Sequence, residues 1–221
     1  GNHKRIVVLG PYILETLLAL NVQPIGYADH IAFRQGDYTA PSQQIPYLGN
    51  RITQPLANVG LARTPSIEAI IKLRPDLILG IDDVSSSQYE TLNNIAPTLL
   101  FDYFLVEENL RAVAQAVNQT EQAEQLLNQT QQQVLQARET FAPLVATHPQ
   151  VALLNSSELQ TINISTNPAG LCRSLIESLG FQLVFPPGMS QDDANPVQPI
   201  SIETLSQLND GKNCYVIIEQ V

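Results

Sequence analysis

The sequence predicts an α/β protein of two lobes separated by a long helical segment. Short aliphatic runs alternate with segments of helical periodicity in the first hundred residues, and the same alternation restarts near residue 148. The intervening stretch contains no Gly and a single Pro, Pro143. One unit is also written twice, as "PSIEAIIKLRPDLILG" at 65–80 and more faintly as "PISIETLSQLNDGKNCYVII" at 199–218. The copies lie too far apart for a solenoid repeat, so the repetition indicates two similar lobes.

The first half of the chain predicts one three-layer lobe. Helical periodicity is present at 12–21, within 65–80 and at 85–96, whereas 30–64 is predicted as loops because Gly, Pro, Asn and Gln interrupt any period. Four strands separated by helices favour a parallel sheet with helices on both faces. The predicted strands are 5–10, 23–29, 76–80 and 97–104.

The middle of the chain predicts two helices with a joint near Asn118 to Glu121. This stretch is dense in Ala, Leu, Gln and Glu, and its apolar residues fall on one stripe. A coiled coil is the alternative, but no strict heptad lasts for three or four repeats. The α/β pattern then resumes at 150–157, with a strand at 150–154, a helix at 169–180 and a strand at 181–185. The predicted domains are therefore 1–106, 107–147 and 148–221.

Composition excludes several classes of protein. With 221 residues and 44% hydrophobic content, the chain is long and apolar enough to bury a core. The net charge of −10 disfavours nucleic acid as a partner. No apolar run reaches the ~18 residues that a membrane span needs. The N-terminal residues enter a strand almost at once, so we expect no signal peptide in this sequence.

Five blocks of sequence, taken in order, resemble one known family. The blocks are "RIVVLGPYILETLLALNVQPIGYAD", "YLGN…VG…PSIEAIIKLRPDLILG", "YETLNNIAPTLLFD", "AEQLLNQTQQQVLQAR" and "ISIETL". They resemble the periplasmic or cell-surface binding proteins that deliver ferric siderophores, cobalamin or haem to ABC importers. The resemblance implies two three-layer α/β lobes with parallel sheets, joined by a single long backbone helix, and a ligand cleft between the lobes. Members usually continue for further strand–helix units, so the second lobe is expected to be incomplete.

The resemblance also implies a function, a partner and a location. We expect a monomeric bacterial substrate-binding protein that captures a ferric siderophore and delivers it to an ABC importer permease dimer for iron uptake. It would work in the periplasm, or lipid-anchored at the outer face of the cytoplasmic membrane, without an intrinsic cofactor. Cobalamin or haem is the alternative ligand. A small α/β enzyme or a scaffold is less favoured, because the sequence contains no G-x-S-x-G, Walker A or G-x-G-x-x-G motif.

Candidate ligand-binding residues lie in the loops that follow the predicted strands, because open α/β sheets bind ligands at the carboxyl ends of their strands. Guanidinium groups and phenols suit the oxygens of a metal chelate, and aromatic faces suit its apolar parts. Alternatively, the arginines are solvated loop residues paired with nearby carboxylates. Ala62 stands where many members that bind anionic siderophores carry Arg, which favours a neutral or modestly charged chelate. The candidates are Tyr12, His30, Arg34, Arg63, Tyr103 and Asn155.

Glu68 and Glu203 occupy matching places in the two copies of the repeated unit, each two residues after a Ser. The resemblance implies that the two glutamates dock onto the two permease subunits, one from each lobe. The alternative is that each Glu only supports the start of a helix that Ser66 or Ser201 caps. The two roles are compatible.

Metal and thiol chemistry are not expected to carry the function. Only three histidines are present, His3, His30 and His148, and they do not form a ligand set with nearby acids. Asp82 and Asp83 are expected to be loop carboxylates, and no directly bound metal is expected. The two cysteines, Cys172 and Cys214, are predicted to be unbridged and mostly buried, because their elements place them at opposite edges of the second sheet.

Overall fold

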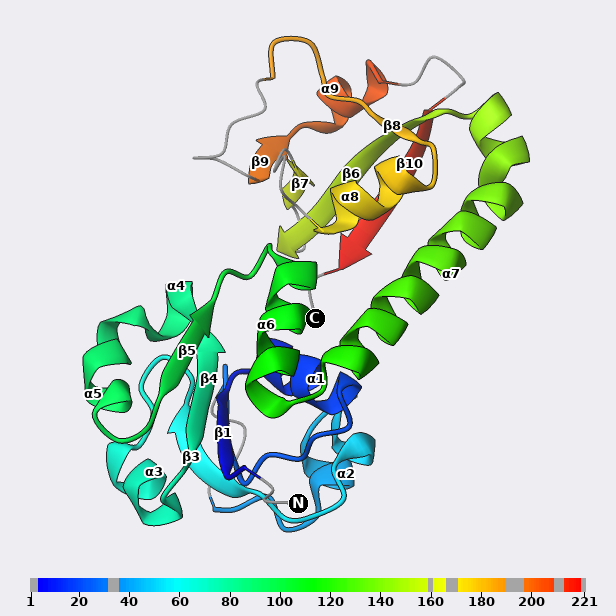
Figure 1. The fold of residues 1–221 in the computed structure, drawn as a ribbon. Coiled ribbons are helices and arrows are strands. Elements are labelled where there is room, and N and C mark those ends of the chain that lie inside the picture. The colour runs from blue at the N-terminus through cyan, green and yellow to red at the C-terminus, as the bar shows by residue number, and fades with distance from the viewer. Residues whose placement is uncertain are drawn as a thin grey trace. The chain divides into compact units, whose positions relative to one another are not determined.

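The computed structural model describes residues 4–31, 36–158, 161–165, 171–189, 197–208 and 213–219. The chain divides into two compact units, Gly1–Leu127 and Asn128–Val221. The division falls within a long helix, α7 (Thr120–Thr147), which Figure 1 shows in green. The α/β fold class and the long helix are confirmed. The domain bounds 1–106, 107–147 and 148–221 remain a prediction.

The first unit contains a five-stranded, fully parallel sheet. Its strands lie in the order β3-β2-β1-β4-β5. The connections from β1 and from β4 therefore run in opposite directions, and the sheet has its switch point between these two strands. The strands are β1 (Ile6–Leu9), β2 (Gly26–Asp29), β3 (Ala57–Leu61), β4 (Leu77–Ile81) and β5 (Thr98–Phe101).

Helices cover both faces of this sheet, as the sequence predicts (Figure 1). Side chains alternate along a strand, so Ile6 and Val8 of β1 face one layer while Val7 and Leu9 face the other. All four side chains are fully buried, which stabilises the unit by about 1.5–3 kcal/mol for each of them. The first layer contains α1 (Pro11–Ala19) and α6 (Val106–Val117), and the second contains α3 (Ile67–Leu73) and α5 (Tyr89–Asn93).

Three basic side chains bind the carboxyl ends of three helices at the amino edge of this sheet. Arg51 donates to the Leu18 carbonyl at the end of α1 at 2.9 Å, and Arg5 donates to the Leu73 carbonyl at the end of α3 at 2.7 Å. Lys4 donates to the carbonyl of Ala116 near the end of α6. A cation in this position satisfies the last carbonyls and opposes the negative end of the helix dipole. These three cations therefore stabilise helix ends at the amino edge of the sheet, opposite the carboxyl ends of the strands.

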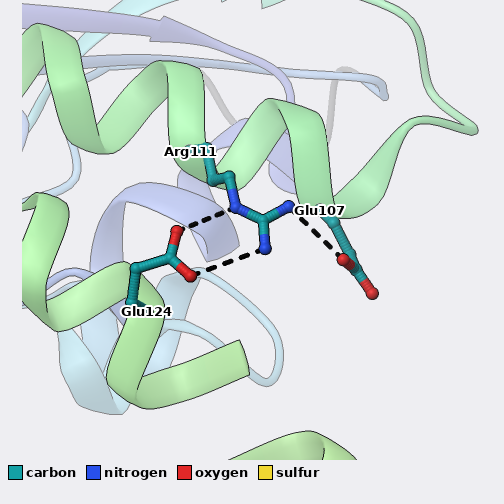
Figure 2. Close-up of polar contacts among 3 residues, drawn as sticks. All are labelled: Glu107, Arg111 and Glu124. Carbon is teal, nitrogen blue, oxygen red and sulfur yellow. Dashed lines mark hydrogen bonds and ion pairs between the residues drawn. The ribbon is translucent and has the colours of Figure 1, made fainter. Parts of the chain in front are cut away.

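The corner between α6 and α7 lies where the sequence predicts it. Asn118 ends α6 in the left-handed conformation with φ 57°, and the Gln119 amide donates to the carbonyl of Ala114 at 2.8 Å. Figure 2 shows the polar contact that holds the corner: Arg111 of α6 lies 2.8 Å from Glu124 of α7. The prediction of a joint near Asn118 to Glu121 is confirmed.

The second unit contains a mixed sheet around a long central strand, β6 (Gln150–Glu158). β6 pairs in parallel with β10 (Asn213–Glu219) and with β8 (Gln182–Leu183). It pairs in antiparallel fashion with β7 (Thr161–Ser165), which in turn pairs with β9 (Val197–Ile200). Two helices accompany these strands, α8 (Leu171–Ser178) and α9 (Ile202–Ser206). Phe141 of α7 contacts Phe181 with ring centroids 6.2 Å apart.

Some expectations are wrong in detail. The second sheet is not entirely parallel, because β6 ends at Glu158 and β7 begins at Thr161, and a parallel connection needs about a dozen residues or more. The segment 30–64 is not only loops: it contains β3, α2 (Pro41–Gln44) and the 3₁₀ turn η1 (Gly49–Arg51). The helical segment 85–96 is broken into the end of α4 (Asp82–Ser85), the 3₁₀ turn η2 (Ser86–Gln88) and α5.

The cysteine prediction is half right where it can be compared. Cys172 is unbridged, but it is exposed on α8 rather than buried. Position 172 lies on the solvent-facing side of α8, so the small thiol is exposed there. The side chain of Cys214 lies outside the described residues.

Candidate functional site

The switch point between β1 and β4 places the candidate site at the carboxyl edge of the first sheet. In open parallel sheets the crevice that receives a ligand forms where neighbouring connections diverge. The residues that follow β1 are Gly10, Pro11 and Tyr12, so the first turn of α1 lies at this edge. Tyr12 is therefore positioned by a helix and not by a loop.

An aromatic cluster of Tyr12, Tyr103 and Phe104 forms at this edge. The rings of Tyr12 and Tyr103 lie 5.0 Å apart at 49°, and those of Tyr103 and Phe104 lie 5.4 Å apart in an edge-on arrangement. Tyr103 is 43% exposed and Phe104 is 39% exposed, so the cluster offers ring faces to solvent. Such a surface suits the apolar parts of a small ligand.

Asn109 of α6 links the cluster to the end of β5. Its side chain is only 4% exposed, and its amide nitrogen donates both to the Asp102 carbonyl at 2.5 Å and to the Tyr12 hydroxyl at 3.2 Å. Burial is the main cause that raises the pKa of Tyr12, and nearby Tyr103, Glu15 and Asp102 add to it, although the bond from Asn109 lowers the pKa. The phenol is therefore neutral at physiological pH.

Sequence reasoning missed Asn109. The residue lies on the buried stripe of α6, four positions before the fully buried Val113. A lone amide on an otherwise apolar helix face is the signal that could have identified it, because a buried amide requires hydrogen-bond partners.

His30 lies over the start of α1. Gly10 has a φ of 117°, and a β-carbon at this position would lie 3.6 Å from the Nε2 atom of His30. A β-carbon at that distance would make only ordinary van der Waals contact with the imidazole, so it is the positive φ that favours glycine here. His30 and Tyr12 flank the same short segment after β1.

Arg63 follows β3 in a turn that the Thr64 amide closes by donating to the Leu61 carbonyl at 3.0 Å. The preceding residue, Ala62, is fully buried, and its amide donates to the Asp29 carbonyl at 2.8 Å. Within the described part of the chain, no carboxylate pairs with the exposed Arg63 guanidinium. The alternative of a loop arginine neutralised by a nearby acid is therefore not seen here. Arg34 lies outside the described residues.

Asn155 does not lie in a loop. It lies within β6 of the second unit, opposite the buried Asn163 of β7. The strand continues to Glu158 because β6 pairs with β7 beyond this point, which the sequence pattern did not reveal. The structure thus groups Tyr12 with Tyr103 and places His30 and Arg63 after neighbouring strands of the same sheet, while Asn155 belongs to the other unit.

Both glutamates of the repeated unit lie in the first turn of a short helix. The Ser66 hydroxyl accepts from the Ala69 amide at 3.3 Å, and the Ser201 hydroxyl accepts from the Thr204 amide at 3.1 Å, so both serine caps are confirmed. Glu68 lies 2.7 Å from Lys72, and the hydrogen bond from Lys72 lowers the pKa of Glu68. Hydrogen bonds from its own amide and from Ser201 lower the pKa of Glu203. Both carboxylates are exposed and charged.

A cavity of about 720 Å³ lies at the opposite, amino edge of the first sheet. Its cations, Lys4 and Arg5, already bind helix carbonyls, and parallel sheets do not bind ligands at this edge. Among the residues that the structure describes, no group of three His, Cys, Asp or Glu side chains is placed to hold a metal ion. The same residues include no helix that is both long and apolar enough to cross a bilayer.

The comparison with known protein families decides the wider identity of the chain. The model of the periplasmic binding protein family matches residues 6–216, which is nearly the entire sequence. The chain belongs to this family. Members of the periplasmic binding protein family are binding proteins rather than enzymes.

Relatives and solved structures of the family support the same placement. The probable siderophore-binding lipoprotein YfiY of Bacillus subtilis is 35% identical over 129 residues, which are 58% of this chain and 37% of YfiY. The chain spans 29% to 61% of the lengths of four curated relatives that it matches.

Two solved structures show the fold. Staphylococcus aureus SirA matches with a TM-score of 0.78 and 21% identity over 99% of this chain and 76% of SirA. Vibrio cholerae FhuD bound to Fe³⁺-Desferal matches with a TM-score of 0.73 and 19% identity over 98% of this chain and 78% of FhuD. The α/β fold of periplasmic binding proteins that the sequence predicts is confirmed.

Proposed function

We propose that this chain is the substrate-binding protein of an ABC importer and that it captures a ferric siderophore for iron uptake. The observation that carries the proposal is the exposed aromatic cluster at the switch-point edge of a periplasmic binding protein. Arg63, unpaired within the described residues, and His30 follow neighbouring strands of the same edge. YfiY is a probable siderophore-binding lipoprotein and the FhuD structure holds Fe³⁺-Desferal, and both support the same ligand class.

The charges around the described edge favour a neutral or modestly charged chelate. Asp29 ends β2, Asp82 follows β4 and Asp102 follows β5, whereas Arg63 is the described cation at these strand ends. A chelate with several negative charges would be repelled by these carboxylates. Tyr12, His30, Arg63 and Tyr103 are the proposed contacts from the first unit, and Arg34 and Asn155 remain proposed contacts.

The proposed partner is the permease dimer of the importer. Glu68 and Glu203 each present a charged, solvent-exposed carboxylate, so each can pair with a permease arginine, one glutamate from each unit. Delivery to a permease places the protein in the periplasm or at the outer face of the cytoplasmic membrane, where it acts as a monomer. It binds and releases its ligand without catalysing a reaction and without a resident cofactor.

A ligand panel tests the proposal. Equilibrium dialysis at pH 7 compares ferric desferrioxamine B, ferric bacillibactin, ferric citrate, cyanocobalamin and haem at one protein concentration. We expect saturable, one-to-one binding of a ferric chelate, with visible absorption that follows the protein. If only cobalamin or haem shows saturable binding, that compound is the ligand and the siderophore assignment is wrong. If no member of the panel binds, the proposal is refuted.

A further inference from the structure

The hydrogen bonds around Tyr12 have a fixed direction. A backbone carbonyl can only accept, so the Asn109 atom that lies 2.5 Å from the Asp102 carbonyl must be the amide nitrogen. The same nitrogen lies 3.2 Å from the Tyr12 hydroxyl oxygen. An amide nitrogen only donates, so the hydroxyl oxygen accepts this bond and its proton points elsewhere.

That proton has no acceptor in the part of the chain that the structure describes. The hydroxyl of a half-buried tyrosine gains free energy from donating, because the group loses part of its hydration on folding. Tyr12 is also packed against the exposed ring of Tyr103, on the surface where the ligand is proposed to bind. The free donor and the aromatic surface thus belong to one site.

We propose that Asn109 holds Tyr12 as a neutral hydrogen-bond donor to an oxygen of the bound chelate, and that Tyr12 does not coordinate iron as a phenolate. This inference rests on the proposed function. Its ligand arrives with the iron already saturated by its own oxygens, as in a hexadentate hydroxamate, and offers one of those oxygens to Tyr12. Asn109 is then a positioning residue, and burial that raises the pKa of Tyr12 favours the same state.

A double-mutant cycle tests the role of Asn109. Tyr12→Phe keeps the ring and removes the donor, so the affinity for ferric desferrioxamine B or ferric bacillibactin, whichever binds, should fall about threefold to tenfold. Asn109→Asp replaces a donor by an acceptor that takes the Tyr12 proton, and it should cause a similar loss. The double variant should bind within about twofold of Tyr12→Phe, because the second change then has nothing left to remove. Tyr47→Phe, at an 86% exposed tyrosine, is the matched control and should leave affinity unchanged.

The spectrum of bound iron tests the state of the phenol. Ferric nitrilotriacetate has open coordination positions, so a phenolate ligand would give a visible charge-transfer band with the wild-type protein. We expect no such band that depends on Tyr12. Such a band, lost in Tyr12→Phe, would overturn the proposal, as would losses in the two single variants that multiply in the double variant.

The two proposals fail differently. If no chelate binds, the siderophore function is wrong, and the nitrilotriacetate spectrum still decides whether Tyr12 can coordinate iron. If a hexadentate chelate binds and Tyr12→Phe binds it equally well, the function stands and the donor role is refuted. Thermal melting of each variant shows whether it is folded, and Tyr12→Phe with the spectrum suffices if Asn109→Asp does not fold.

Discussion

The guanidinium of Arg111 on α6 donates to both carboxylate oxygens of Glu124 on α7, at 2.8 Å and 3.5 Å. It also reaches Glu107 one turn earlier on α6 at 3.4 Å (Figure 2). Beside it, Ala123 is almost fully buried in the core of the first unit. The base of the long helix is therefore attached to the first unit by the apolar side chains of Ala123 and Leu126 and by a forked ion pair.

Arg111→Ala should lower the melting temperature of the protein slightly at low salt, because it removes this forked pair. Arg111→Lys should rescue the loss only in part, since an ammonium cannot make the same two parallel bonds. The difference between wild type and Arg111→Ala should shrink in high salt, because exposed ion pairs are screened. A loss that does not depend on salt would show that Arg111 acts by packing.

Tyr103→Ala should weaken binding of the ferric chelate by roughly 0.5–1.5 kcal/mol or more, because it removes the central ring of the aromatic cluster. Tyr103→Phe should retain most of the affinity if the ring face carries the contact. Tyr47→Ala removes an exposed ring outside the cluster and is the control. If Tyr103→Ala and wild type bind the chelate with equal affinity in equilibrium dialysis, the aromatic cluster does not contact the ligand.

Arg63→Ala should weaken binding by roughly 1–3 kcal/mol if the guanidinium makes a charge-assisted bond to a ligand oxygen. Arg74→Ala changes an exposed arginine just after α3 and should leave the affinity for the chelate unchanged. The loss should be larger for the more anionic of two chelates that bind. If the variant with both Arg34 and Arg63 replaced binds the chelate with unchanged affinity, the arginines do not contact the ligand.

Replacing Glu68 and Glu203 together by Ala should leave chelate affinity intact and impair uptake of radioactive iron through the importer. The matched control replaces Glu121 and Glu139, two exposed acids of α7. Both glutamates have lowered pKa values, so their charge persists as the pH falls and is lost only below the ordinary Glu pKa of about 4.3. Docking should thus survive a change from pH 7 to pH 5.5. Wild-type transport by the double variant would exclude the docking role.

Cys172 should react with a thiol reagent in the folded protein, because it is free and exposed. Cys172→Ser should abolish the fast reaction without changing the melting temperature, since the side chain is not part of the core. Titration of the unfolded, unreduced protein should find two free thiols. A single slow thiol in the folded wild-type protein would contradict the exposed position of Cys172 on α8.

Much of the first unit could be predicted from sequence because its buried strands are continuous aliphatic runs. β3 was missed because it is an edge strand whose five residues include Asn58 and Gly60, which disfavour strands by propensity. The joint near Asn118 to Glu121 agrees with local chemistry, because Asn tolerates the left-handed conformation that ends α6.

The site was harder to predict. The loops that follow the strands supply candidate residues, but the sequence does not show which of their side chains meet. The pairing of Tyr12 with Tyr103 depends on where α1 begins relative to the end of β5, and no local pattern states this. Asn109 comes from a helix interior, where a polar residue is ordinarily read as solvent-facing. The mixed second sheet depends on strand pairing between distant segments, which periodicity does not specify.

Lys4, Arg5 and Arg51 close the helix ends at the amino edge, while the proposed ligand contacts of the first unit stand at the other edge of the same sheet. The side chains that bind the helix ends and the side chains proposed to contact the ligand are thus separate sets. Mutations can alter the strand-end turns without touching the groups that secure the helices. If the proposed contacts bind the chelate, single substitutions in these turns can change the preferred ligand and leave the helix ends intact.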